Sequence, residues 1–258
     1  MKKVFVIANT KGGVGKTTIA AHVMPALFPG CEILEIDDNN QSSIFTKSEF
    51  IKRFESIKVK ECESKLEELT FKLLDETKEV LIIDCGGGND TKKVINNIKE
   101  LNLSDLADVT FIVPIMNSYM QAKNAEGMKD LLTNKKVIYA LNGVVDTSSV
   151  RKDWLFWYGS DLLGLENFEE KLGFPKSVKI PHSHYFEIAA LNKMTISDFA
   201  KKAREVDMLT FQKELFEKYK DNKEKYIEEL RAYKRSKGAK DFLDSFMVKL
   251  KEEILQND

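Results

Sequence analysis

The sequence predicts an α/β fold with a doubly wound, mostly parallel sheet and a helical C-terminal extension. Three observations lead to this prediction. Short β-branched runs alternate with helical patterns through roughly the first 180 residues. A glycine-rich turn joins the first such run to the first helical pattern. After about Thr195, glycines and strand patterns become rare, and helix formers and charges continue to Asp258.

Six strands are predicted, and several of them are apolar on both faces. The runs Val80–Ile83 and Phe111–Val113 are typical of parallel strands covered by helices on both sides. Pro25 lies inside the first helical pattern and is expected to kink that helix or to end it early. The predicted strands are Lys3–Ala8, Glu32–Asp37, Glu79–Asp84, Asp108–Pro114, Lys136–Leu141 and Ser177–Ile180. The predicted helices lie near Lys16–Leu27, Lys65–Asp75, Thr91–Glu100 and Met120–Leu132.

The composition is typical of a soluble protein with a sizeable core. Hydrophobic residues make up 43% and charged residues 31%, and 40 basic side chains face 41 acidic ones. This balance excludes a globally basic nucleic-acid coat but leaves room for a local basic patch. The apolar runs are shorter than the ~20 residues that span a bilayer, and Val4–Ala8 is too short for a secretion signal. Cys31, Cys62 and Cys85 do not suit a disulfide framework or a Cys-x-x-Cys zinc site, so a cytoplasmic protein is expected.

A glycine-rich segment after the first strand carries the strongest functional signal. Its glycines let backbone N–H groups surround phosphate oxygens, and the following helix adds its positive N-terminal end. The first glycine of the standard phosphate-loop pattern falls on Thr10, but the variant K-G-G-x-G-K-[ST] is met in full. The predicted nucleotide-binding residues of this loop are Lys11, Gly12, Gly13, Val14, Gly15, Lys16, Thr17 and Thr18.

Two side chains of this loop have specific expected roles, which make ATP and Mg²⁺ the predicted ligands. Lys16 is expected to reach the β- and γ-phosphates, and the Thr17 hydroxyl is expected to coordinate Mg²⁺.

Acidic side chains follow the second predicted strand. Acids at a strand end beside a phosphate loop can hold Mg²⁺ or orient the attacking water. Two registers are open. In one, Asp37 orients the water and Glu35 is the earlier acid; in the other, Asn39 takes the water position and Asp37 is the earlier acid. An amide cannot accept a proton, so the second register predicts slower turnover, and Asp37 is important in both.

The apolar strand before Asp84 resembles a Walker B strand. Asp84 is expected to hold Mg²⁺ through a water, and the three glycines at 86–88 permit a loop that senses the γ-phosphate. The predicted metal residues are therefore Thr17, Asp37 and Asp84.

Together the three motifs resemble the ParA/MinD superfamily of deviant Walker A ATPases. In that family the head lysine of the loop crosses a nucleotide-sandwich dimer and contacts the partner's phosphates. The resemblance implies that Lys11 acts in trans, as an arginine finger does in other NTPases, and that the chain forms a homodimer on binding ATP. It also implies slow hydrolysis that a protein partner stimulates. The predicted catalytic residues are Lys11, Lys16 and Asp37.

Two later positions are candidates for contact with the adenine. Asn142, at the end of the strand from Lys136, carries an amide that can pair with the base; the alternative is a tight Asn-Gly turn. Pro181 lies where the family has a late loop along the base.

The helical tail leaves two questions open. Its segment 231–240 contains five basic and no acidic residues: Arg231, Lys234, Arg235, Lys237 and Lys240. They could bind DNA phosphates without sequence preference, or form a solvated helix end. An apolar stripe follows between Phe242 and Ile254, with acids among its flanking charges. Because anionic lipid favours basic flanks, we expect the stripe to pack on the domain or on a partner, not on a membrane.

The function implied by the resemblance is an ATP-dependent switch for DNA segregation or maintenance, such as plasmid partition. A membrane-associated positioning ATPase of the MinD type and an ATP-dependent metabolic ligase of the same superfamily are the alternatives. We expect residues 1–200 to form the ATPase domain and residues 201–258 to form a helical extension packed on it.

Overall fold

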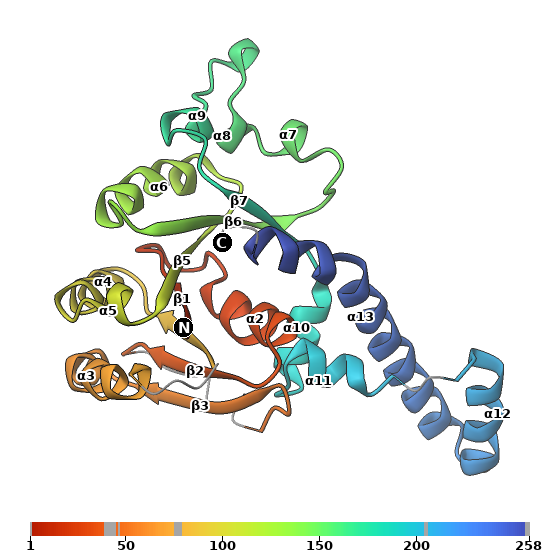
Figure 1. The fold of residues 1–258 in the computed structure, drawn as a ribbon. Coiled ribbons are helices and arrows are strands. Elements are labelled where there is room, and N and C mark those ends of the chain that lie inside the picture. The colour runs from red at the N-terminus through yellow and green to blue at the C-terminus, as the bar shows by residue number, and fades with distance from the viewer. Residues whose placement is uncertain (1, 39–44, 46, 75–78, 204–205, 256–258) are drawn as a thin grey trace.

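A seven-stranded parallel sheet forms the centre of the molecule (Figure 1). The computed structural model describes residues 2–38, 45, 47–74, 79–203 and 206–255. Within these residues the strand order is β3-β2-β4-β1-β5-β6-β7, and all neighbours are parallel. The doubly wound α/β fold is confirmed, and the described sheet is wholly rather than mostly parallel. The strands are β1 (Lys3–Ile7), β2 (Cys31–Ile36), β3 (Ile51–Ile57), β4 (Val80–Cys85), β5 (Asp108–Ile115), β6 (Lys136–Val144) and β7 (Ser177–Pro181).

Helices lie on both faces of the sheet. One face is covered by α3 (Cys62–Leu73), α4 (Asn89–Glu100), α5 (Leu103–Leu106), α6 (Tyr119–Leu131), α8 (Leu155–Tyr158) and α9 (Phe168–Lys171). The other face is covered by the helix that follows β1, by α10 (His184–Leu191) and α11 (Ile196–Lys201), and by part of α13 (Lys223–Leu255). The remaining helical segments are η3 (Val59–Glu61), α7 (Val150–Asp153), η4 (Asp161–Leu163) and α12 (Met208–Tyr219).

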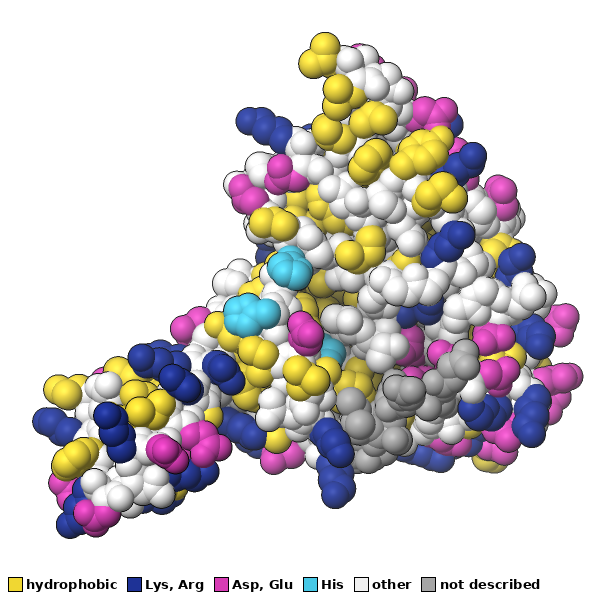
Figure 2. All heavy atoms as spheres, turned by 180° about the vertical axis from the view of Figure 1, so that it is seen from behind, with side chains coloured by type: hydrophobic (Ala, Val, Ile, Leu, Met, Phe, Trp, Pro, Cys, Tyr) yellow, Lys and Arg dark blue, Asp and Glu magenta, His cyan; other side chains and the backbone are white. Residues whose placement is uncertain are grey.

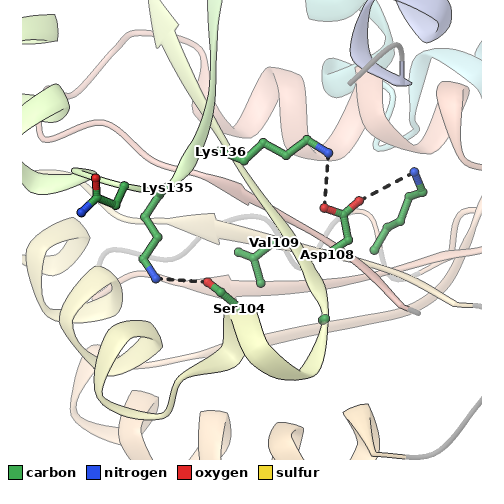
Figure 3. Close-up of a pocket in the computed structure, with 8 residues that line it drawn as sticks. Ser104, Asp108, Val109, Lys135 and Lys136 are labelled. Atoms are coloured by element: carbon green, nitrogen blue, oxygen red, sulfur yellow. Dashed lines mark hydrogen bonds and ion pairs between the residues drawn. The ribbon is translucent and has the colours of Figure 1, made fainter. Parts of the chain in front are cut away.

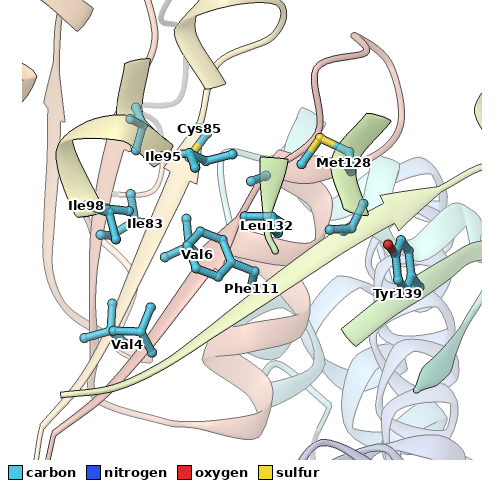
Figure 4. Packing of buried hydrophobic residues seen from close by; sticks show 14 of the residues in the cluster. Val4, Val6, Ile83, Cys85, Ile95, Ile98, Phe111, Met128, Leu132 and Tyr139 are labelled. Atoms are coloured by element: carbon cyan, nitrogen blue, oxygen red, sulfur yellow. The ribbon is translucent and has the colours of Figure 1, made fainter. Parts of the chain in front are cut away.

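Side chains alternate between two cores, one on each face of the sheet. In β1, Val4 and Val6 belong to the first core, whereas Phe5 and Ile7 belong to the second. Burying an aliphatic or aromatic side chain of this size stabilises the fold by about 1.5–3 kcal/mol. The first core is shown in Figure 4, where the labelled members are Val4, Val6, Ile83, Cys85, Ile95, Ile98, Phe111, Met128, Leu132 and Tyr139. The loop that leaves β1 therefore starts from a firmly held strand.

The edge strand β3 is absent from the predicted strands. Its sequence, Ile-Lys-Arg-Phe-Glu-Ser-Ile, contains three charged residues and lacks a continuous apolar run. Lys52, Arg53 and Ser56 are exposed, because an edge strand is only partly covered. Charges on an edge strand also discourage pairing with another chain.

The helix after β1 adjusts to Pro25 without ending there. It begins as α1 (Lys16–Thr18), continues as the π-helical segment η1 (Ile19–Val23) and finishes as α2 (Met24–Leu27). Proline lacks the N–H that a regular helical turn requires, and the wider π-helical turn before it accommodates that loss. The helix therefore reaches Leu27, as its predicted range does, although Pro25 lies inside it.

The helices after residue 200 form two parts that differ in their contacts. The second half of α13 is buried against the second core through Ala239, Leu243, Leu250 and Ile254. The first half of α13 packs with α12 around Phe211, Leu215 and Tyr233. In Figure 1 this pair projects from the body, and we call α12 with residues 223–238 the arm. The domain division at residue 200 stays a prediction.

Gly238 lies where α13 passes the body. A Cβ at this position would lie 2.1 Å from the hydroxyl oxygen of Tyr185 in α10, so any other residue here would require the Tyr185 side chain to move. None of the helices in the described part of the chain combines the length and apolar character that crossing a membrane requires.

Buried His22 links the helix after β1 to α11. Its Nδ1 accepts a hydrogen bond of 3.0 Å from the backbone N–H of Ile196, and its ring packs edge-on against Phe45. The side chain is only 4% exposed. Burial lowers the pKa of His22 to about 4, despite the opposing charge of Asp198.

Protonation of His22 should therefore destabilise the fold in acid. The unfolded chain binds the proton near the ordinary histidine pKa, so stability is complete above that value and falls as the pH drops toward about 4. We expect the free energy of unfolding to fall by up to about 3 kcal/mol more in the parent than in His22→Asn, measured by urea unfolding at several pH values. Equal pH dependence in the two proteins would contradict this prediction.

Candidate functional site

The three predicted motifs meet at the carboxyl edge of the sheet, around the end of β1. The register places Glu35 of β2 beside Asp84 of β4, and Asp84 beside Ile7 of β1. The loop that follows β1 therefore lies next to the acids that end β2 and β4. Ligands of open parallel sheets bind at this edge.

The fully buried amide of Asn9 holds this loop in place. Its Nδ2 donates to the backbone oxygen of Pro114 at 2.7 Å. Its Oδ1 accepts from the backbone N–H of Lys11 at 2.8 Å and from Nδ2 of Asn124 in α6 at 2.7 Å. Asn9 is absent from the residues predicted from the sequence, where its signal was a polar side chain directly after a buried strand.

Glycines allow the backbone conformation of the loop. Gly13 and Gly15 have φ angles of +70° and +89°, which side chains other than glycine rarely adopt. A Cβ on Gly15 would also lie 2.0 Å from Nδ2 of Asn142. That Nδ2 donates to the backbone oxygen of Val14 at 3.0 Å, so Asn142 lies directly against the loop.

The Lys16 ammonium is buried inside the loop. Its Nζ donates to the backbone oxygens of Asn9 at 3.1 Å and Lys11 at 2.9 Å. Burial lowers the pKa of Lys16, and nearby acids, Asp84 foremost, act in the opposite direction. A buried cation held mainly by backbone oxygens is a suitable partner for phosphate.

Asp84 and Thr17 provide oxygen atoms suited to Mg²⁺. The side chain of Asp84 is 4% exposed and accepts a hydrogen bond from the Thr17 hydroxyl. Its Oδ1 is buried and has no hydrogen-bond partner among the described residues. Burial raises the pKa of Asp84 to about 7, and Glu35 adds to the shift. Both groups fit the oxygen preference of Mg²⁺, which keeps water and phosphate oxygens as its other ligands.

This arrangement differs from a metal site built by protein groups alone. The described part of the chain contains no group of three or more His, Cys, Asp or Glu side chains that could hold a metal ion. A Mg²⁺ ion here would thus depend on nucleotide phosphates for part of its coordination.

The acids after β2 point to different places. Asp37 is half-buried and lines the space beside the loop. Asp38 is exposed, and its Oδ1 accepts from the backbone N–H of Val59 at 3.0 Å. Asn39 lies outside the described residues, so the two registers of this motif stay open.

A further acid, Asp90, lines the same space and is absent from the predicted site. It is half-buried in the first turn of α4, after the glycines that follow Asp84. Burial raises the pKa of Asp90, and the carboxylates of Asp38 and Asp37 raise it further. The signal in the sequence was an acid soon after a glycine-rich turn, a common feature that the motifs did not include.

The loop, the residue that follows β2 and the segment that follows β4 line one cavity of about 500 Å³. This volume is within the usual range for small-molecule sites. The lining residues are Gly12, Gly13, Gly15, Lys16, Thr17, Thr18, Asp37, Cys85, Gly87 and Asp90.

The remaining predicted binding residues are Lys11, which belongs to the loop, and Asn142 and Pro181, which come from later strands. Lys11 is exposed at the loop head. Asn142 contacts the loop, as described above, and also lies 3.6 Å from the sulfur of Met116. Pro181 ends β7 and pairs with Val144 of β6. In the strand order β1-β5-β6-β7, Pro181 is one strand farther than Asn142 from β1, the strand that precedes the loop.

The predicted basic segment lies on α13 and is not part of the cavity lining. Arg231, Lys234 and Arg235 are exposed, and Lys237 is half-buried. Lys240 forms an ion pair of 3.1 Å with Asp244. Figure 2 shows the arm with basic side chains among acidic and hydrophobic ones.

A second hollow, of about 520 Å³, lies near the amino ends of β1, β5 and β6 (Figure 3). Asp108 is 3.3 Å from Nζ of Lys136 and 3.8 Å from Nζ of Lys3, and Lys135 donates to Ser104 at 3.2 Å. The charged and hydroxyl side chains of this hollow therefore pair with one another.

Comparison with known proteins gives a consistent result. The profile of the CobQ/CobB/MinD/ParA nucleotide-binding domain matches residues 5–254. The structure is similar to MinD from Aquifex aeolicus, with 16% identity over 75% of this chain and 88% of that chain and a TM-score of 0.52. It is also similar to the MinD cell division ATPase of Pyrococcus furiosus, with 14% identity over all of both chains and a TM-score of 0.52. No curated protein sequence matches the chain. At these identities the structural likeness concerns the fold.

The geometry of the loop predicts different effects for two glycines. Gly15→Ala combines a positive φ, which costs about 1–2 kcal/mol in an L-residue, with a Cβ that meets Asn142. Gly12→Ala is the matched control, because a Cβ there has no atom within 4 Å. We expect Gly15→Ala, but not Gly12→Ala, to lower the Tm of the nucleotide-free protein in a thermal melt. Equal Tm values for the two variants would show that the loop does not have this conformation.

Proposed function

The chain belongs to the CobQ/CobB/MinD/ParA nucleotide-binding family, and we propose that it is an ATP-dependent dimerisation switch for DNA segregation or maintenance. The observation that carries the proposal is the cavity lined by the loop glycines, buried Lys16 and Thr17, with the buried carboxylate of Asp84 next to Thr17. This combination supplies backbone donors, a cation and oxygen ligands for a nucleoside triphosphate with its metal ion.

The loop would hold the phosphates of ATP. Lys16 would donate to phosphate oxygens in place of its two backbone acceptors. The negative charge of the phosphate would then neutralise the buried cation. Thr17, Asp84 and Asp37 would hold Mg²⁺, directly or through water; the ion when bound neutralises charge on the phosphates. Asn142 and Pro181 are the proposed adenine contacts, and the position of Asn142 against Val14 supports its part.

Lys11 would act across a dimer. Its backbone N–H is fixed by Asn9, and its side chain is exposed at the rim of the cavity. An exposed lysine on a fixed loop head can reach phosphates bound by a second copy and stabilise charge in the transition state. Hydrolysis would be slow and would rely on positioning, with a protein partner accelerating it.

DNA contact would come from the arm. Arg231, Lys234 and Arg235 are exposed close together on one long helix, which suits binding to phosphates without sequence preference. The alternative of a membrane-binding terminal helix is weakened because Leu243, Leu250 and Ile254 of the apolar stripe are buried against the body. Nothing in the cavity favours the alternative of a metabolic ligase.

Two lysine variants separate nucleotide binding from dimerisation. Lys16→Ala removes the buried cation, and we expect nucleotide affinity to fall by about tenfold to 100-fold or more, measured with a fluorescent ATP analogue. Lys11→Ala should bind the nucleotide nearly as the parent does but lose the ATP-dependent dimer, measured by light scattering after size exclusion. A Lys11→Ala protein that still dimerises with ATP would refute the sandwich arrangement.

Charge reversal on the arm tests the DNA role. We expect the parent to bind a random-sequence duplex with ATP and Mg²⁺ more tightly than with ADP and Mg²⁺, and less tightly at higher salt. The triple variant Lys234→Glu, Arg235→Glu and Lys237→Glu should lose this binding in fluorescence anisotropy. The matched control reverses Lys60, Lys123 and Lys152, which are exposed on the body. Equal losses in both triple variants would remove the arm from the proposal.

A further inference from the structure

We propose that Asp90 is a second water-orienting carboxylate of this site, acting beside Asp37 on the water that attacks the γ-phosphate. The inference rests on the proposed ATPase function and adds a residue that none of the three motifs contains. It is carried by the position of Asp90 in the wall of the cavity that the phosphate loop also lines.

Hydrogen bonds fix Asp90 relative to the phosphate loop. The backbone N–H of Gly88 donates to the backbone oxygen of Thr10 at 2.8 Å. The hydroxyl of Thr91, the next residue, is buried and has two backbone oxygens as acceptors, that of Gly86 at 2.5 Å and that of Asn9 at 3.1 Å. The start of α4 is thus hydrogen-bonded to the backbone oxygens of Asn9 and Thr10, where the loop begins. A carboxylate held in this way is preorganised and needs little rearrangement to act.

The turn before Asp90 runs beside the expected position of the terminal phosphate. A Cβ placed on Gly87 would lie 3.8 Å from the backbone nitrogen of Gly12 and 4.0 Å from Nζ of Lys16. Lys16 is the group that reaches the β- and γ-phosphates. The segment that carries Asp90 therefore passes next to the end of the triphosphate.

Asp90 and Asp37 flank one point in this wall. A Cβ placed on Gly86 would lie 3.2 Å from Cγ of Asp37 and 3.2 Å from Oδ2 of Asp90. Since Gly86 has no side chain, the carboxylate that follows β2 and the carboxylate in the first turn of α4 come near one another there. A water molecule at the cavity side of this point can donate hydrogen bonds to both acids.

Other acids near the cavity have different positions or partners. Asp84 is buried and receives the Thr17 hydroxyl. Glu35 is 4% exposed and accepts from the Ser56 hydroxyl at 2.8 Å. Asp38 accepts from the backbone of Val59. Of the acids in the described residues, Asp37 and Asp90 are the two that line the cavity.

The chemical step balances with these groups. The water oxygen forms a bond to the γ-phosphorus while the bond from that phosphorus to the β–γ bridging oxygen breaks, giving ADP and inorganic phosphate. Asp90 accepts a hydrogen bond from the attacking water, takes its proton as the bond forms, and releases that proton to the phosphate or to solvent. Such positioning of a proton acceptor typically contributes a factor of about 100 or more to the rate.

The test is single-turnover hydrolysis of ATP with Mg²⁺ by full-length Asp90→Asn. We expect its rate to fall about 100-fold or more, while ATP affinity and the ATP-dependent dimer stay close to those of the parent. Asp90→Glu, which keeps the carboxylate, should recover part of the rate. Asp105→Asn is the matched control, because it removes the same charge from an exposed position on α5.

Each outcome decides the assignment. Parent-like hydrolysis by Asp90→Asn overturns it, and so does an equal loss of rate and ATP affinity, which would assign Asp90 to binding. A Tm of Asp90→Asn well below that of Asp105→Asn, with no rescue by Asp90→Glu, would make its role structural and also overturn it. A parent that binds ATP without hydrolysing it refutes the inference alone, whereas a parent that does not bind ATP refutes the proposed function as well.

Discussion

The buried side chain of Asn9 is the constraint on which the phosphate loop depends. Its amide uses three hydrogen bonds to connect the loop with β5 and α6. Its backbone oxygen accepts from Lys16 and from Thr91, so the loop lysine and the first turn of α4 share the same anchor. Removing a partner from such a buried group costs about 1–3 kcal/mol for each polar atom left unsatisfied. Loop, lysine and α4 therefore keep a fixed relative position.

Burying the charged groups of the site costs folding free energy, which a bound ligand of complementary charge can offset. Lys16 is buried with backbone oxygens as its acceptors, and burial lowers its pKa. Asp84 and Glu35 are buried side by side on neighbouring strands, and burial raises the pKa of Asp84. Phosphate oxygens and Mg²⁺ are the complementary charges for these two halves. In the proposed function, the same atoms whose burial is costly would provide the affinity for nucleotide.

The long helix α13 connects the site's own helix with the arm. Its second half packs against α2, which continues the helix from the phosphate loop, and against α11. Its first half carries the exposed basic residues. Gly238 lies between these halves, against Tyr185 of α10, a helix that begins three residues after Pro181. Packed side chains of α13 therefore join the helix that follows the phosphate loop to the arm.

The sequence by itself determined the parallel α/β fold, the phosphate loop and the acids that end β2 and β4. It could do so because buried parallel strands are apolar on both faces and because phosphate binding needs glycines and lysine at fixed spacing in one short segment. The strand β3 escaped prediction, because its position at the edge allows charged residues in place of an apolar run. Only the tertiary structure decided that Asn9 and Asp90 join the site and that Asn142 lies on the loop. Those contacts join residues that are distant in sequence. They depend on the order of the strands and on helix packing, and neither of these produces a local sequence pattern.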